Sequence, residues 1–361
     1  MPSFASATDY PLTVTDLGGR RVEIKSEPKR IVIQDGRDLF TLALLDRKDP
    51  FQRIVGWNNI LSRSDNHSWS VFAKAWPESS ARATDFKFGD EGQLNLELVA
   101  SSKADLIIAQ KRVLPALEDA KVIDRMAQLG VPVLLVDSEL DPTNNAPQSV
   151  TLLGKVLNRE AEAAEYAGFY RKRLDQVRSA MAGAPPIKVF VEAKAGQKGL
   201  DSCCFTHGDV YWGKLITAAG GQNLGASLVK GRTGEVALET VLGARPDVYV
   251  LTGSPFANQS SVSPPFGLTG DKAAIDAAMT KIAGRKGFEH LKAIQARRLV
   301  GLYHQLYASS WNIYAVEFLA KAFYPERLRQ IDPDATLRQV IGMTGLPKDT
   351  PAIFGATLAT R

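Results

Sequence analysis

The stretch at residues 158–183, NREAEAAEYAGFYRKRLDQVRSAMAG, predicts one long helix. Asn158 is a favourable N-cap residue, Gly183 is a favourable C′ residue, and Pro185 and Pro186 end the helix. At 1.5 Å per residue the rod is roughly 36 Å long. An ordinary surface helix and a rigid rod joining two lobes both fit this pattern, so the flanking sequence decides. The apolar residues that recur at helical spacing are Ala163, Tyr166, Ala167, Tyr170, Leu174, Val177 and Met181.

Strands and helices alternate on both sides of this helix. Residues 10–24 predict a hairpin, residues 58–92 a long polar and aromatic loop, and the tail from 332 to 361 is mixed. Before the helix, buried strands are predicted at 30–34, 53–57, 105–110 and 133–137, and helices at 38–45, 95–101 and 114–129. After it, strands are predicted at 187–192, 247–251 and 297–304, and helices at 211–219, 237–242 and 308–324.

This alternation with short turns predicts parallel sheets covered by helices. We therefore predict an α/β fold with two Rossmann-like lobes, each with a parallel-type sheet, joined by one long rigid helix. The predicted N-terminal lobe covers residues 1–145, the linker region 146–183 and the C-terminal lobe 184–361.

A similarity between two segments of the sequence supports two similar lobes. The segment NLELVASSKADLIIA begins at Asn95, and VALETVLGARPDVYVLTG begins at Val236. Each places a glutamate, Glu97 or Glu239, in a short helix before an aspartate that opens a buried strand.

Composition sets limits on function. The net charge is +5, from 44 Lys and Arg against 39 Asp and Glu, and no long basic run points to nucleic acid. No apolar run approaches the ~20 residues of a membrane span. The first residues, MPSFASATDYPLTV, lack the basic start and apolar region of a signal peptide, so the chain is either cytoplasmic or has lost a leader.

The two cysteines, Cys203 and Cys204, are adjacent. Zinc sites usually space their cysteines by two or more residues, so the sequence disfavours a zinc site here. A vicinal disulfide and two thiols packed in a turn both remain open from the sequence.

No catalytic motif is present. The chain lacks a G-x-S-x-G elbow, an H-E-x-x-H pair, a P-loop and a Rossmann glycine fingerprint. The four histidines, which are His67, His207, His290 and His304, are scattered. Two α/β lobes without such a constellation favour a closing-cleft binding protein over the alternative, a two-lobe enzyme acting on a bulky anionic substrate.

The chain resembles the periplasmic substrate-binding proteins of iron–siderophore, haem and cobalamin ABC importers. The resemblance covers nearly the whole chain and rests on the order and spacing of its motifs. Besides the long helix and the two similar segments, these are LTVTDLGGRRVEI, PKRIVI, LITAAGGQNLG and FEHLKAIQARRLVGLYH.

The resemblance implies a periplasmic location and delivery of the ligand to an ABC permease at the inner membrane. It implies that one acid on each lobe docks onto basic residues of the permease, and the matching positions are Glu97 and Glu239. It also implies a monomer with no resident cofactor and no nucleic-acid partner.

The segments DSCCFTHGDVYWG and YHQLYASSWNIYAVEFLAKAFYPE resemble a subgroup of ferric-siderophore binders. This implies a ferric chelate held in the inter-lobe cleft, with no direct protein–metal bond. Haem is the second candidate, with an axial ligand from His207, Tyr211 or His304, followed by cobalamin and last a divalent metal. The candidate ligand-binding residues are Trp57, Arg63, Arg82, Lys111, Arg112, His207, Tyr211, Trp212, Arg232, Tyr303 and His304.

Overall fold

The structure is a computed structural model that describes residues 8–256, 260–268 and 270–358. The chain divides into two compact units. Unit 1 comprises Met1–Leu61, Phe72–Arg171 and Val340–Pro347, and unit 2 comprises Ser62–Val71, Lys172–Gln339 and Lys348–Arg361. Among the described helices, four contribute residues to both units, which are α2 (Leu61–Ser64), α3 (Asn66–Ala75), α9 (Glu160–Met181) and α16 (Pro333–Gly342).

Unit 1 is built on a sheet of five parallel strands in the order β5-β4-β3-β6-β7. The sequence runs IVI in β3 and LIIAQ in β6 are fully buried, as expected for strands covered on both faces. Because β3 is followed by β4 on one side and β6 lies on its other side, the strand order reverses between β3 and β6. The strands are β3 (Ile31–Ile33), β4 (Ile54–Trp57), β5 (Thr84–Asp85), β6 (Leu106–Gln110) and β7 (Val133–Val136).

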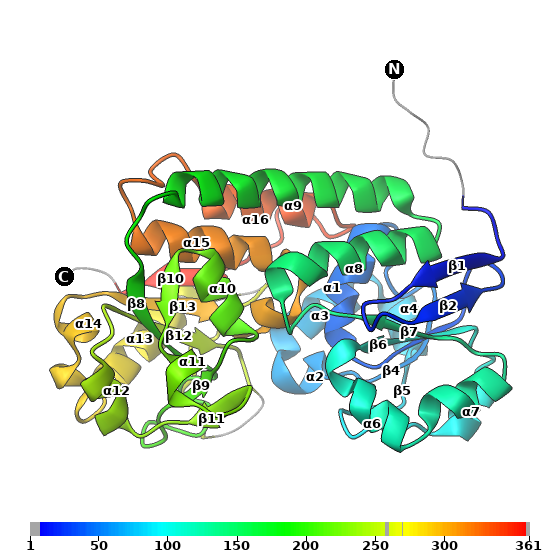
Figure 1. The fold of residues 1–361 in the computed structure, drawn as a ribbon, viewed down its shortest axis with the longest axis horizontal. Coiled ribbons are helices and arrows are strands. Elements are labelled where there is room, and N and C mark those ends of the chain that lie inside the picture. Colours follow the sequence, from blue (N-terminus) through cyan, green and yellow to red (C-terminus); the bar gives the residue numbers. More distant parts are fainter. Residues whose placement is uncertain (1–7, 257–259, 269, 359–361) are drawn as a thin grey trace. The chain divides into compact units, whose positions relative to one another are not determined.

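Helices surround this sheet, and a hairpin of β1 (Leu12–Thr15) and β2 (Arg21–Ile24) precedes it (Figure 1). One apolar core cluster packs Phe88, Val99, Leu117 and Met126 against the sheet residue Ile107. The helices that lie wholly in unit 1 are α1 (Leu39–Leu45), α4 (Pro77–Arg82), α5 (Leu96–Ser101), α6 (Leu114–Asp119), α7 (Val122–Gln128) and α8 (Pro142–Val156), and α2 (Leu61–Ser64) begins at its border.

Unit 2 has a second five-stranded sheet, in the order β10-β8-β12-β13-β14, that is parallel except for β14. The strand order reverses between β8 and β12. A small antiparallel pair, β9 (Phe205–His207) with β11 (Thr233–Glu235), lies beside β8. The sheet strands are β8 (Ile187–Glu192), β10 (Gly221–Asn223), β12 (Val248–Gly253), β13 (Leu299–Tyr303) and β14 (Gly355–Thr357).

The helices of unit 2 are mostly short. The longest that lies wholly within it, α13, has 12 residues, and its N-cap Asp271 accepts hydrogen bonds from two backbone N–H groups of the first turn. They are α10 (Trp212–Ala218), α11 (Gly225–Leu228), α12 (Leu238–Ala244), α13 (Lys272–Ala283), α14 (Lys292–Gln295) and α15 (Ile313–Phe323). The predicted mixed α/β architecture with parallel sheets is therefore confirmed.

Four local predictions were wrong. Residues 58–92 are not a long loop, because they contain α2, α3 and α4. Phe72 and Trp76, four residues apart, stack with ring centres 6.0 Å apart, which is the contact expected between such positions on a helix.

The predicted helix at 114–129 breaks where Lys121 takes a left-handed φ of 52°. Asn158 does not cap α9, because it also has a positive φ and its side chain accepts from the backbone of Thr8. The predicted helix at 308–324 begins only at Ile313, because a 3₁₀ turn at Ser310–Asn312 replaces its first part.

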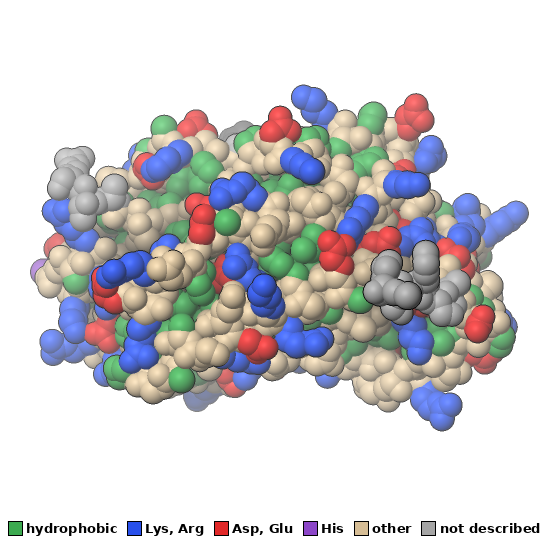
Figure 2. Space-filling view, turned by 90° about the horizontal axis from the view of Figure 1, so that it is seen from above, with side chains coloured by type: hydrophobic (Ala, Val, Ile, Leu, Met, Phe, Trp, Pro, Cys, Tyr) green, Lys and Arg blue, Asp and Glu red, His purple; other side chains and the backbone are tan. Residues whose placement is uncertain are grey.

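Lys and Arg side chains are interspersed with Asp and Glu on the face drawn in Figure 2. This mixture agrees with the small net charge and differs from the one-sign stripe of a nucleic-acid binder. Within the described residues, no helix is long and apolar enough to cross a bilayer.

Candidate functional site

Polar residues of unit 1 gather at the carboxyl ends of β3 and β6, where the strand order reverses. In open α/β sheets, ligands bind in the crevice at this point. The loop DGRD follows β3, and Asp35 caps its 3₁₀ turn by accepting a hydrogen bond from the backbone N–H of Arg37 at 3.0 Å. Lys111 and Arg112 follow β6, and Glu139 follows β7.

Arg37 and Arg112 share the same carboxylates. Arg37 donates to Asp35 at 2.8 Å and to Glu139 at 2.6 Å. Arg112 donates to Glu139 at 2.6 Å, to Asp35 at 2.9 Å and to Asp90 at 2.7 Å. We call these five residues the arginine–carboxylate cluster. Both guanidinium groups are largely buried, with 5% and 11% of the side chain exposed, so the carboxylates compensate charge that water cannot reach.

The pKa values in this region follow from burial and charge. Burial alone would raise the pKa of Asp35, but the Arg37 and Arg112 guanidinium groups hold that pKa well below its ordinary value. Burial raises the pKa of Glu139 despite both arginines. Burial and the Asp35 charge raise the pKa of the neighbouring Asp38 to about 8. Asp38 is therefore mainly protonated at neutral pH.

This edge of unit 1 therefore carries no net positive charge. The positive charges of Arg37, Arg112 and the adjacent Lys111 are matched by Asp35, Glu139 and Asp90. Ionisation of Asp38 would add a further negative charge. The arginines are already bound to carboxylates, so an anionic ligand would have to displace those carboxylates.

Unit 2 presents a different surface at the equivalent edge. His207 ends β9, Tyr211 precedes α10, and His304 and Tyr307 follow β13. The ring centre of His207 lies 5.2 Å from that of Tyr211, 5.5 Å from that of Tyr307 and 6.4 Å from that of His304. The ring of Phe256, after β12, lies 6.0 Å from that of His304. We call these five residues the aromatic cluster.

The histidines of the aromatic cluster are held neutral or hydrogen-bonded within the fold. Burial, with a smaller effect of the Lys194 charge, lowers the pKa of His207 to about 3. The Nδ1 atom of His304 lies 2.8 Å from the hydroxyl of Thr252. Tyr211, Tyr307 and Phe256 are partly exposed, whereas both histidines are buried, so the cluster presents aromatic rings that suit the apolar face of a chelate or macrocycle.

The structure brings together only some of the residues predicted from sequence. His207, Tyr211 and His304 meet in the aromatic cluster, and Trp212 lies beneath it, with its indole N–H donating to the carbonyl of His304 at 3.3 Å. Arg112 lies in the arginine–carboxylate cluster. The prediction did not include Arg37, Asp35, Glu139, Asp90, Phe256 and Tyr307. Their position directly after strands was the available signal for Arg37, Asp35, Phe256 and Tyr307.

Other predicted residues lie elsewhere. Trp57 is buried against Phe51 in unit 1, and Tyr303 is buried in unit 2, where its hydroxyl bonds to Asp65. Arg63 and Arg232 are exposed.

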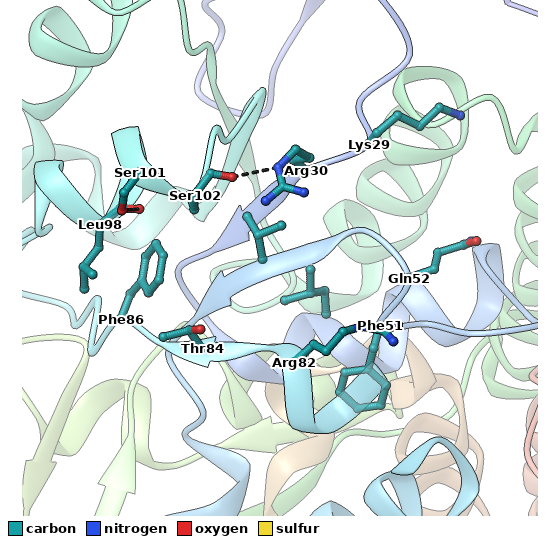
Figure 3. A pocket seen from close by; sticks show the side chains of 12 residues that line it. Lys29, Arg30, Phe51, Gln52, Arg82, Thr84, Phe86, Leu98, Ser101 and Ser102 are labelled. Atoms are coloured by element: carbon teal, nitrogen blue, oxygen red, sulfur yellow. Dashed lines mark hydrogen bonds between the residues drawn. The ribbon is translucent and has the colours of Figure 1, made fainter. Parts of the chain in front are cut away.

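Arg82 lies at the amino edge of the unit 1 sheet, opposite the arginine–carboxylate cluster. It lines a hollow of about 460 Å³ together with Lys29, Arg30 and residues that begin β4. Figure 3 shows Arg30 donating to the backbone carbonyl of Ser102 in this hollow, at 2.7 Å. Arg82 and Arg112 are therefore not parts of one site on this sheet.

The two predicted docking acids have the same local setting. Glu97 lies in the first turn of α5 and Glu239 in the first turn of α12, and both are exposed. Each short helix leads into a buried parallel strand, β6 or β12. A carboxylate in a first turn is favoured by the helix dipole, so this placement is stable without a partner.

The adjacent cysteines form a disulfide. The bond lies in the loop between β8 and β9, beside Tyr249 and Glu192. Of the two possibilities open from sequence, the structure has the vicinal disulfide.

These features define a class: an α/β protein with two sheet-centred units, each with polar or aromatic side chains at the carboxyl ends of its strands. The family comparison agrees. The chain belongs to the periplasmic binding protein family, whose model matches residues 51–306. This family binds solutes for ABC transporters. A search of the curated proteins finds no match.

Solved structures share the fold. The TroA-like periplasmic binding protein FepB from Veillonella parvula is 25% identical, with a TM-score of 0.86 over 97% of this chain and 100% of that one. The molybdate-binding protein MolA of Haemophilus influenzae is 16% identical, with a TM-score of 0.68 over 96% and 100%. A protein of an Fe3+-hydroxamate transport system from Saccharomonospora viridis is 18% identical, with a TM-score of 0.53 over 88% and 100%.

Proposed function

We propose that this protein captures a ferric siderophore in the periplasm and delivers it to an ABC permease of the inner membrane, without acting as an enzyme. We further propose that the chelate is uncharged, as in a ferric hydroxamate. Two observations, each made within one unit, support the proposal: the arginines at the carboxyl edge of the unit 1 sheet are balanced by carboxylates, and aromatic rings gather at the corresponding edge of unit 2.

The charge argument separates siderophore classes. Three singly charged hydroxamates neutralise a ferric ion, whereas three doubly charged catecholates leave a strongly anionic complex. An anionic complex would need positive charge that Arg37 and Arg112 do not offer, because Asp35, Glu139 and Asp90 already neutralise them. A neutral complex needs hydrogen bonds and apolar contact, and the tyrosine rings and hydroxyls of the aromatic cluster offer both.

The first test is a titration of the protein's tryptophan fluorescence with ferric hydroxamate, ferric catecholate and ferric carboxylate chelates and their iron-free forms. We expect saturable quenching by the ferric hydroxamate. Binding by the catecholate alone would contradict the charge argument but leave the siderophore proposal intact. If no chelate quenched the fluorescence, both the charge argument and the siderophore proposal would be contradicted. Release of iron-free chelate or ferrous iron during incubation would show turnover and favour the enzyme hypothesis.

Two pairs of variants refine this test. Tyr307→Leu removes a ring of the aromatic cluster and should weaken binding. Tyr324→Leu is its control, because the hydroxyl of Tyr324 donates to the carbonyl of Gly220 at the amino edge of the same sheet. Asp90→Asn removes a carboxylate whose side chain is 60% exposed, and should strengthen binding of an anionic chelate roughly threefold to tenfold while leaving a neutral one unchanged. Asp85→Asn, in β5, is the control for that substitution.

Haem is the second candidate, favoured by the aromatic cluster itself. Its tyrosine and histidine rings are of the residue types that ligate haem iron, and the low pKa of His207 keeps that imidazole in its neutral, ligating form. Addition of hemin would then produce a Soret band that shifts on binding and is altered by Tyr211→Phe or His207→Gln. Fluorescence quenching by hemin alone would place haem first.

Delivery to the permease is proposed to use Glu97 and Glu239. Both carboxylates are exposed and belong to different units, so each can form a charge-assisted contact with arginine on a partner. The double substitution Glu97→Ala and Glu239→Ala should abolish transport and leave ligand affinity unchanged. Loss of affinity in the purified double variant would contradict the docking assignment.

A further inference from the structure

We propose that the reduced forms of Cys203 and Cys204, together with Glu192, constitute a binding site for a divalent thiophilic cation such as Zn2+. A carboxylate oxygen of Glu192 and the Sγ atoms of both cysteines all lie within 4.8 Å of one another. The site does not involve the arginine–carboxylate cluster or the aromatic cluster, and the proposal does not depend on the siderophore function.

The three ligand groups are already directed toward one place. The disulfide brings the two Sγ atoms together, although adjacent side chains of an extended strand point to opposite faces. Glu192 lies at the carboxyl end of β8, and the loop that carries the cysteines returns to the sheet beside it. Tyr249, in the neighbouring strand β12, donates to Glu192 at 2.7 Å and lies 3.6 Å from the Sγ of Cys204.

The surrounding charges are compatible with a bound divalent cation. Arg285 donates to Glu192 at 2.6 Å, and both side chains are buried. A divalent cation adds two positive charges, and two thiolates with the Glu192 carboxylate and the Arg285 guanidinium bring the total to zero. An uncharged assembly is what a buried site tolerates, since uncompensated buried charge is costly.

Arg285 also has unused hydrogen-bond donors beside Glu192. Its Nε and Nη2 atoms are buried and have no hydrogen-bond partner among the described residues. These N–H groups can donate hydrogen bonds to the carboxylate when Glu192 turns toward a metal. Such outer contacts orient metal ligands in proteins.

A small hollow gives access to Glu192. It has a volume of about 170 Å³ and is lined by Glu192, Lys194, Ser202 and Glu235, among others. Ser202 directly precedes the half-buried Cys203, whereas Cys204 is buried. The hollow thus reaches the Glu192 carboxylate, although neither cysteine lines it. Zn2+ that is held by three protein ligands takes water as its fourth.

The chemistry proceeds in two balanced steps. A dithiol reductant transfers two electrons and two protons to the S–S bond, giving two thiols and an oxidised reductant. The cation then binds two thiolates and releases two protons. Soft thiolate ligands select Zn2+ or Cd2+ over Mg2+ and Ca2+.

The experiment uses the full protein reduced with a water-soluble phosphine, which takes up the oxygen of water to form a phosphine oxide. After the reagent is removed under argon, Cd2+ is titrated and the near-ultraviolet sulfur-to-metal charge-transfer absorbance is followed. We expect a band that saturates at one Cd2+ per chain, and protection of both thiols from a disulfide-forming thiol reagent. The oxidised protein should show neither effect.

Variants distinguish a built site from adventitious binding. Cys203→Ser should abolish the band, and Glu192→Gln should weaken Cd2+ binding by about tenfold or more. Glu235→Gln, which also changes an acid lining the hollow, should leave affinity unchanged. Because Glu192→Gln removes the partner of Arg285 and can impair folding, its circular dichroism is measured alongside. A reduced wild-type protein whose thiols remain fully reactive with stoichiometric Cd2+ would overturn the proposal.

Discussion

Asp38 provides the sharpest test of the electrostatics in unit 1. Its side chain is 2% exposed, and its Oδ1 atom accepts a hydrogen bond from the Gln110 side chain at 2.7 Å. Its Oδ2 atom is buried and has no hydrogen-bond partner among the described residues. Burial and the charge of Asp35 raise its pKa to about 8, although the Gln110 bond and Arg37 oppose this shift.

The sign of the stability effect follows from proton binding. A raised pKa means that, between the ordinary carboxyl value and about pH 8, the folded state holds a proton that the unfolded state has lost. The free energy of unfolding therefore falls by about 1.4 kcal/mol for each pH unit in this window. The stabilising effect of this proton is fully present below the unfolded pKa and is lost as the pH rises through the folded one.

Asp38→Asn removes this titration and keeps an acceptor for Gln110. Relative to the wild type, the variant should gain roughly 4 kcal/mol of stability between pH 5 and pH 8 and then stay level. Urea unfolding of both proteins at intervals across this range measures the difference, and Asp85→Asn controls for the change in net charge. Parallel stability curves for the wild type and Asp38→Asn, or a carboxyl carbon resonance of Asp38 that titrates near pH 4, would refute the reasoning.

Two further stability predictions follow from other parts of the structure. Arg173 lies 3.1 Å from the buried Glu317, whose pKa burial raises to about 7, so Arg173→Gln should cost about 3 kcal/mol of unfolding free energy at pH 8 and clearly less at pH 6, where Glu317 is protonated. Equal urea midpoint shifts at both pH values would contradict this. A Cβ at Gly56 would clash with the Phe86 ring, so Gly56→Ala should cost about 1–3 kcal/mol. A Cβ at Gly168, in α9, would meet no described atom beyond the helix's own backbone within 4 Å, so Gly168→Ala should add up to about 1 kcal/mol. Thermal unfolding of the two variants in parallel checks both signs.

Seven strands of the two sheets were predicted because burial on two faces leaves continuous apolar runs, as in LIIAQ of β6. The short strands β5, β10 and β14 were missed because they carry no such run. Helices with a clear apolar period, such as α9, were predictable because their buried face repeats every three or four residues. The segment with α2, α3 and α4 was missed because its aromatic residues stand among many polar ones. The break at Lys121 was missed because a left-handed lysine has no sequence signal of its own.

The candidate site was less predictable. A tryptophan or tyrosine near a strand end gives the same signal whether it packs in the core or faces a ligand, and Trp57 and Tyr303 are buried. The charge balance around Arg37 and Arg112 was harder to predict than the aromatic residues. The charge of the arginines can be read from the sequence, but its neutralisation cannot, because Glu139 lies 102 residues from Arg37. Only the return of β7 beside β6 brings that carboxylate to the loop after β3.

The arginine–carboxylate cluster also constrains how binding depends on pH. Below about pH 8 Asp38 is mainly protonated, and its ionisation above that value adds negative charge beside Asp35 and Glu139. Asp38 is therefore the carboxyl group beside the cluster whose raised pKa falls in this range.

An anionic chelate should therefore lose affinity between pH 7 and pH 9, whereas a neutral ferric hydroxamate should bind with nearly constant affinity. Fluorescence titrations of both chelates at these pH values measure the contrast, with Asp38→Asn as the matched variant. That substitution should remove the pH dependence for the anionic chelate. If the pH dependence persists in Asp38→Asn, another group controls it and the charge-based choice of ligand loses its support.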